Sequence, residues 1–111
     1  MSNITTIKIA KEGINYSDQE RSVILDNRPH HFSVWFDDYL RLWTIGLYNE
    51  GDYLIDSFEV EYHARKSWAT DEAVRLRNQL PEKVEIWVYQ RTQPTRPCVS
   101  GFHSSQIYKT I

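Results

Sequence analysis

The chain has 111 residues, of which 41% are hydrophobic and 25% are charged, and its formal net charge is -2. This length supports one hydrophobic core and is too short for two, while the composition excludes global disorder. The small negative charge argues against an electrostatically driven nucleic-acid binder, which needs a basic surface. Residues 91–111 nevertheless carry three basic and no acidic residues, whereas residues 37–61 carry seven acidic residues against one arginine.

The cysteine content and the hydropathy of the chain indicate the cellular compartment in which the protein is expected. Cys98 is the only cysteine, so no intrachain disulfide can form, which fits a reducing compartment. The N-terminal residues lack a basic segment followed by a long apolar stretch, and no window approaches the roughly 20 apolar residues of a membrane helix. We therefore expect a cytoplasmic protein with no membrane association.

The first 30 residues are predicted to be mainly extended. Residues 4–9 form a short β-rich stretch that predicts a first strand. Ser17 and Glu20 have the spacing of a capping box, but the following residues 21–25 are short and partly β-branched. We predict a turn that leads into a strand there, followed by a second turn at residues 26–29.

Three strands with alternating hydrophobicity follow. Their inward-facing residues recur at every second position: Phe32, Val34 and Phe36 in the first strand, Trp43, Ile45 and Leu47 in the second, and Phe58, Val60 and Tyr62 in the third. Residues 49–52, Asn-Glu-Gly-Asp, predict a hairpin turn between the second and third strands. These strands therefore read as an antiparallel meander.

The period of the apolar residues then changes to that of a helix. Four apolar residues recur at spacings of four, three and four: Ala69, Ala73, Leu76 and Leu80. We predict a helix at about residues 70–80, with Thr70 as its N-cap and Pro81 as its end. Residues 83–90 predict a further strand, with Val84, Ile86 and Val88 inward.

These elements predict an α+β fold in which an antiparallel meander of about five to six strands, flat or curled, packs against one helix. Residues 1–90 form the single domain. Residues 91–111, with two prolines in the stretch 94–97, form a basic C-terminal tail or an edge segment of the same domain.

The face of the sheet opposite the predicted core carries the candidate binding residues. Strand parity places six residues there: Trp35, Glu59, Glu61, His63, Trp87 and Tyr89. Aromatic rings are enriched at the centres of interfaces because they bury much area with few rotatable bonds. A second core layer, beneath the tail or inside a curled sheet, is the alternative for the aromatic residues.

Several ionisable residues are candidates for metal binding or catalysis. Glu59, Glu61 and His63 share one side of a strand, and His31 or Asp37 from a neighbouring strand could complete a metal or acid/base site. Alternating glutamates are, however, typical of the solvent face of an antiparallel sheet, and no established ligand spacing is present. We therefore predict no metal site, no cofactor and no catalytic residue.

Two further pairs of residues give weaker indications of a catalytic or metal-binding site. The adjacent His30 and His31 point to opposite faces of a regular strand and can serve one site only if a bulge intervenes. Cys98 and His103 lie five residues apart, which does not establish the geometry that a nucleophile and its base need.

The predicted function is that of a non-enzymatic protein–protein interaction module, such as an inhibitor, an immunity-type protein or an assembly factor. The acidic residues around the rings favour a protein partner with a basic surface, and a homodimer through the same face is a variant. The alternative is a small ligand-binding protein or enzyme with a cup lined by His31, Glu59, Glu61 and His63. Single-stranded nucleic acid is disfavoured, because the glutamates on this face repel phosphates.

Overall fold

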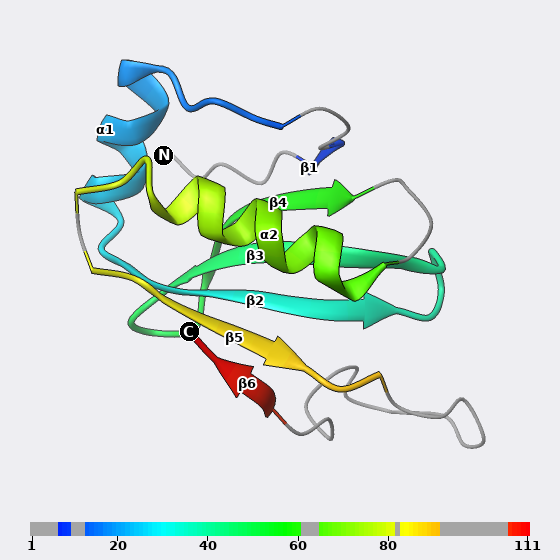
Figure 1. The fold of residues 1–111 in the computed structure, drawn as a ribbon. Helices are drawn as coiled ribbons and strands as arrows, with labels where there is room; N and C mark the ends of the chain where they lie inside the picture. The colour runs from blue at the N-terminus through cyan, green and yellow to red at the C-terminus, as the bar shows by residue number, and fades with distance from the viewer. Residues whose placement is uncertain (1–6, 10–12, 61–64, 82, 92–106) are drawn as a thin grey trace.

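The computed structural model describes residues 7–9, 13–60, 65–81, 83–91 and 107–111 (Figure 1). The elements in chain order are β1 (Ile7–Ile9), α1 (Asp18–Asp26), β2 (Pro29–Asp37), β3 (Leu42–Asn49), β4 (Leu54–Val60), α2 (Lys66–Arg77), β5 (Glu85–Tyr89) and β6 (Ile107–Thr110). The six strands form one sheet in the order β1-β4-β3-β2-β5-β6. Helix α2 lies across one face of the sheet and contacts β2, β3 and β5.

The sheet is mixed, so the predicted purely antiparallel meander is wrong. The β2–β3–β4 portion is antiparallel as expected, but β1 pairs in parallel with β4 and β5 pairs in parallel with β2. Strand β4 runs parallel to β2. Helix α2 then carries the chain back to the end of the sheet at which β4 began, so β5 starts there and also runs parallel to β2. Within the predicted C-terminal segment, β6 pairs antiparallel with β5 at the sheet edge.

Helix α1 corrects a second expectation, because this segment was predicted to be a turn followed by a strand. The capping box forms: the Glu20 backbone N–H donates to Ser17 Oγ at 3.1 Å, and the Ser17 N–H donates to Glu20 Oε1 at 2.9 Å. The nine-residue helix also buries Ile24 completely. Two satisfied backbone donors and one core contact outweigh the weak helix propensity of Val23 and Ile24.

Helix α2 begins earlier than predicted. Its N-cap is Arg65, which forms no side-chain capping bond, and Thr70 lies inside the helix, where its hydroxyl donates to the Lys66 carbonyl at 2.8 Å. The predicted apolar stripe is buried at Ala69, Ala73 and Leu76. Among the described residues, neither helix has the length and apolar composition needed to cross a membrane.

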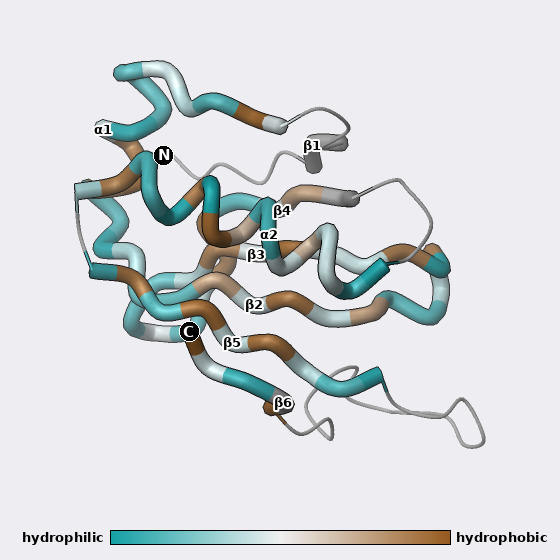
Figure 2. The backbone as a smooth tube through the Cα atoms, viewed as in Figure 1, coloured by the Kyte–Doolittle hydropathy of each residue, from teal (hydrophilic) through white to brown (hydrophobic). Residues whose placement is uncertain are grey.

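The core lies between α2 and the sheet. Hydrophobic residues recur along β2, β3 and β5 beneath this helix (Figure 2). We call this surface of the sheet the helix face, and its fully or almost fully buried members are Phe32, Val34, Trp43, Ile45, Leu47, Phe58, Ile86 and Val88. Phe36 is partly buried against this cluster, and the side chain of Val60 lies outside the described part of the structure.

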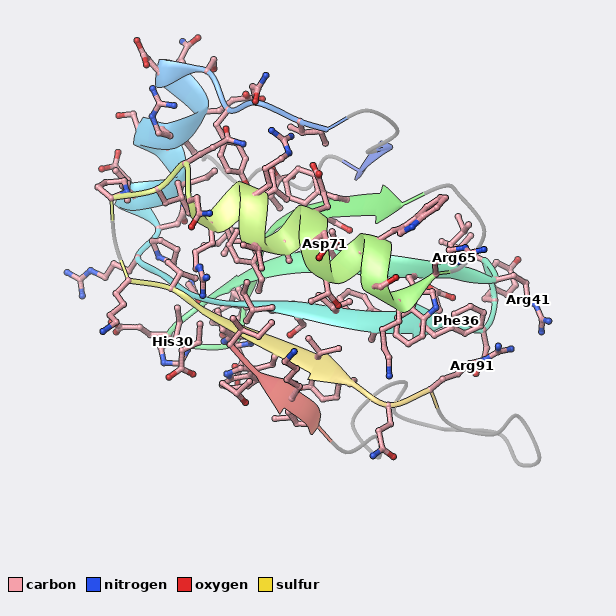
Figure 3. All side chains as sticks on the ribbon, viewed as in Figure 1. His30, Phe36, Arg41, Arg65, Asp71 and Arg91 are labelled. Carbon is pink, nitrogen blue, oxygen red and sulfur yellow. The ribbon has the colours of Figure 1, made fainter. Side chains whose placement is uncertain are left out.

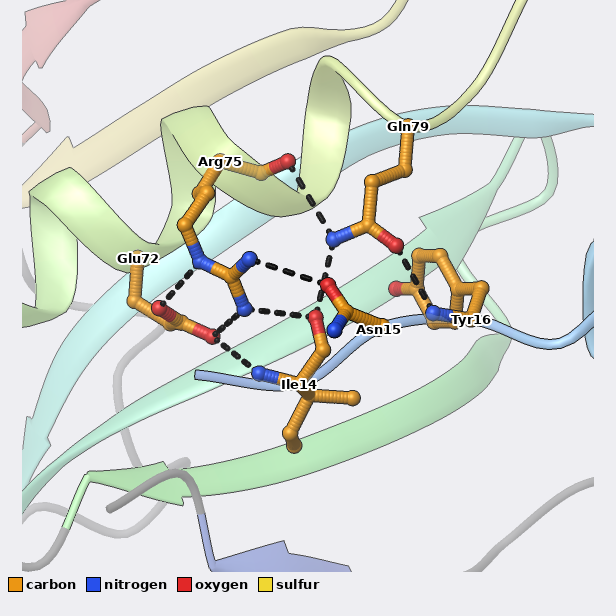
Figure 4. Close-up of polar contacts among 6 residues, drawn as sticks. All are labelled: Ile14, Asn15, Tyr16, Glu72, Arg75 and Gln79. Carbon is orange, nitrogen blue, oxygen red and sulfur yellow. Dashed lines mark hydrogen bonds and ion pairs between the residues drawn. The ribbon is translucent and has the colours of Figure 1, made fainter. Parts of the chain in front are cut away.

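A polar clamp fixes residues 13–16 to α2 (Figure 4). The Gln79 amide bridges two backbone groups: its Nε2 donates to the Ile14 carbonyl at 2.8 Å, and its Oε1 accepts from the Tyr16 N–H at 2.7 Å. Glu72 accepts from the Ile14 N–H at 3.0 Å and also pairs with Arg75. The extended segment before α1 is therefore held by side chains of α2 and of the turn that follows it, about 60 residues later in the sequence.

Candidate interaction site on the open face of the sheet

Helix α2 lies over one face of the sheet, and no described helix covers the other (Figure 1). Aromatic side chains contact one another on this open face. They come from three adjacent strands, β3, β2 and β5. We call this surface the ring face and define it by His31, Trp35, Tyr48, Trp87 and Tyr89. The structure thus brings together the predicted Trp35, Trp87 and Tyr89, and it adds Tyr48, which lies opposite His31 in the β2–β3 register.

The rings of the ring face contact one another in a row. The His31 ring stacks on Trp87, with centroids 3.7 Å apart and planes 11° apart, and on Tyr48, at 5.4 Å and 9°. Trp35 tilts against Tyr48 at 6.4 Å. Because β2 lies between β3 and β5, His31 is the central ring of this row. Stacked and tilted ring contacts of this kind fix the orientation of the rings.

Gly46 in β3 makes room for two of these rings. A Cβ at this position would lie 2.9 Å from Tyr48 Cε1 and 3.1 Å from Trp35 Cη2 and Cζ3. Such approaches are closer than ordinary carbon–carbon contacts, and a planar ring has few ways to yield. Glycine therefore allows Trp35 and Tyr48 to lie down on β3 instead of standing away from it.

Burial divides the ring face into an inner and an outer part. His31 is 3% exposed and Tyr89 is 8% exposed, whereas Trp35, Tyr48 and Trp87 are half-buried. Burial raises the pKa of Tyr48 to about 12 and also raises the pKa of Tyr89, so both phenols remain neutral at physiological pH. The inner rings are packed like a core, and the outer rings keep surface available for contact.

A β-bulge brings two histidines together at the end of the ring face next to Pro29. Pro29 pairs with Asn49 and His31 pairs with Tyr48, so His30 is an extra residue in β2. The two Nδ1 atoms lie 3.0 Å apart, and His30 also contacts Trp87 edge-on at 6.0 Å. Burial, followed by the proximity of His30, lowers the pKa of His31. The bulge thus satisfies the condition under which both histidines can serve one site.

Carboxylates border the ring face at the same end. Glu85 is exposed and accepts a hydrogen bond from the Trp87 indole N–H at 2.8 Å. The exposed Asp52 is close enough to act on His31, where it opposes the lowering of the pKa. The border of the rings is therefore acidic, and one indole is held by a carboxylate.

The other predicted site residues are only partly described. The Glu59 backbone lies in β4, paired with Thr44, but its side chain, Glu61 and His63 lie outside the described residues. The same is true of Cys98 and His103. The His/Glu-lined cup therefore stays a prediction. In the part of the chain that the structure describes, no group of three or more His, Cys, Asp or Glu side chains could hold a metal ion.

No protein-family model, curated protein or solved structure matches this chain. Its chemistry must therefore be inferred from the geometry of the site.

Proposed function

We propose that this protein is a non-enzymatic interaction module that binds a protein partner through the ring face. The observation that supports this is the row of partly exposed rings of Trp35, Tyr48 and Trp87, in which the buried His31 ring stacks on both Trp87 and Tyr48. Interface hot spots are rich in Trp and Tyr that are already oriented by neighbouring contacts, because little conformational entropy is then lost on binding.

The chemistry at the border of the rings favours a partner with a basic surface. A guanidinium or ammonium group can lie over an indole or phenol ring and pair with a carboxylate beside it. Glu85 and Asp52 supply such carboxylates, and both are exposed. An inhibitor, an immunity-type protein or an assembly factor would act in this way, and a second copy of the chain is a variant.

The proposal is tested by affinity capture from a lysate of the source organism with three baits: wild type, Trp87→Ala and Tyr53→Ala. Tyr53 is 74% exposed in the turn before β4 and is not part of the ring face. Each variant therefore removes one aromatic side chain, from the ring face in one case and from outside it in the other. We expect a stoichiometric partner that wild type and Tyr53→Ala retain and Trp87→Ala loses.

Circular dichroism of each bait establishes that it is folded before capture. A second ring-face variant, Trp35→Ala, shows whether loss of binding is a property of the whole ring face or only of a local structural change at position 87. If the same proteins are captured by the wild type and by both ring-face variants, the ring face is not a binding surface and the proposal is wrong.

A further inference from the structure

A second surface with opposite charge lies at the end of the sheet where β2 ends and β3 begins. We call it the arginine patch and define it by Arg41, Arg65 and Arg91, all of which are exposed. The three residues come from the β2–β3 turn, the start of α2 and the chain just after β5, and they lie at the same end of the molecule (Figure 3). His30 is at the other end of the sheet.

Aromatic rings orient the cations of this patch. The Arg91 guanidinium lies 3.9 Å from the centroid of the Phe36 ring, and the Arg65 guanidinium lies 5.2 Å from that of Trp68. The neighbouring Lys66 ammonium is 5.8 Å from the Trp43 ring, which itself packs edge-on against Phe36. A guanidinium stacked on a ring keeps its N–H groups directed sideways, where they can reach a ligand.

The arginine forks have no acidic partner within the described ranges. The ion pairs there are Arg21 with Asp18 and Arg75 with Glu72, and neither involves the patch. The nearby Asp37 carboxylate instead accepts the backbone N–H groups of Tyr39 and Leu40 at 2.9 and 3.0 Å. The first turn of α2 also contains no acidic residue. Asp37 and the exposed Asp38 lie in or next to the same turn as Arg41, but among the described residues neither pairs with a guanidinium group of the patch. The three guanidinium groups outnumber these two carboxylates, which favours an anionic ligand.

We propose that the arginine patch binds a carboxylate-rich segment of a protein partner. Three exposed apolar or aromatic side chains lie beside the guanidinium groups of the patch: Tyr39 at 92% exposure, Leu40 at 42% and Trp68 at 39%. Arginine, tyrosine and tryptophan are the residue types that dominate interface hot spots, and a planar guanidinium matches a carboxylate with two parallel hydrogen bonds.

Two observations favour this ligand over a nucleic acid. An exposed leucine offers apolar contact that a protein segment can use and a phosphodiester backbone cannot. The chain as a whole carries a net charge of -2, so a long polyanion would meet repulsion beyond the patch, whereas a short acidic segment is governed by charges within about 10 Å. The inference does not rest on the ring face, which differs from this patch in place and in charge.

The test measures fluorescence anisotropy of three labelled probes at low and moderate salt. The probes are a peptide of about twelve residues in which glutamates alternate with leucine and serine, the same peptide with glutamine in place of glutamate, and an oligothymidine of equal length. The proteins are wild type, the double variant Arg65→Gln, Arg91→Gln, and the control Arg77→Gln, Lys83→Gln. The control removes the same amount of positive charge outside the patch. A separate Arg41→Gln variant tests the third arginine of the patch without disturbing a ring contact.

We expect the glutamate peptide to bind wild type and the control equally, and the patch variant at least roughly tenfold more weakly. Binding should weaken with salt and be absent for the glutamine peptide. Tighter binding of the oligothymidine, lost in the patch variant, would replace the acidic segment with nucleic acid and overturn the proposal. Equal affinity of the glutamate peptide for all proteins, or no binding to any, would also overturn it.

Discussion

The two faces of the sheet are built from the same strands but stabilised in different ways. On the helix face, Phe32, Ile45 and Phe58 are fully buried beneath α2. On the ring face, the buried positions include His31, Ser33 and Thr44, and the larger rings above them stay half exposed. The helix face is held by apolar burial that depends mainly on volume, whereas the ring face depends on the orientation of a few rings.

This difference separates stability from binding. A face closed by a helix has no surface left to offer, and its residues contribute to the free energy of unfolding. A face that, among the described residues, is covered only by its own rings contributes less to stability and retains contact area for a partner. Substitutions on the two faces should therefore have different effects.

The largest expected effect is that of Phe58→Ala on the helix face. Loss of a fully buried phenyl ring leaves a cavity and should lower the free energy of unfolding by about 3–5 kcal/mol. Trp87→Ala, which removes a larger but half-exposed ring, should cost less. Urea unfolding monitored by circular dichroism measures both. A larger loss for Trp87→Ala would show that the ring face is the true core and would contradict the distinction between the faces.

A smaller effect is expected from Gly46→Ala. The added methyl would press on the Tyr48 and Trp35 rings, and overpacking of this kind costs about 1–3 kcal/mol. The change should also alter the near-ultraviolet circular dichroism, because the two rings must move. Gly51→Ala, in the exposed β3–β4 turn, is the control: its methyl would lie 3.3 Å from the ring of Tyr53, which is 74% exposed and can move away into solvent. Identical stability and spectra for Gly46→Ala and wild type would mean that the rings do not lie on β3.

The pH dependence of stability should be the smallest effect and should arise on the ring face. Burial lowers the pKa of folded His31 from its ordinary value of 6.5, so below about pH 6.5 the unfolded chain binds more protons than the folded chain. The contribution of His31 to stability is therefore complete above pH 6.5 and declines as the pH falls toward the lowered pKa.

Thermal unfolding between about pH 8 and 5 measures this effect, and His31→Phe, which keeps a ring in the stack, should flatten the curve over that interval. An unchanged pH dependence in the variant would assign the acid sensitivity to other groups.

The sequence predicted the local features well because they depend on neighbouring residues. Strand parity placed Trp35, Trp87 and Tyr89 on one face, and the helical spacing of Ala69, Ala73 and Leu76 located the buried stripe of α2. The parallel pairing of β5 with β2 was not predictable in this way, since it follows from the crossover through α2.

Local sequence patterns also could not predict which residues form the row of stacked rings. His31 reaches Trp87 and Tyr48 because β2 lies between β5 and β3, and His30 joins it because of a one-residue bulge. Both depend on strand order and register. Helix α1 differs from the predicted strand for another reason: the capping box of Ser17 and Glu20 and the burial of Ile24 outweigh the low helix propensity of the β-branched residues that follow.

The most direct test of the central claim uses the four tryptophans, two on each side of the sheet. Their indole N–H groups give separate signals in a proton–nitrogen correlation spectrum, assigned with single Trp→Phe variants. During titration with a short arginine-rich peptide as a probe of a basic partner, we expect the Trp35 and Trp87 signals to shift together while those of Trp43 and Trp68 stay in place. Shifts confined to Trp43 or Trp68, or no shift of any indole, would contradict the claim that the ring face is the binding surface.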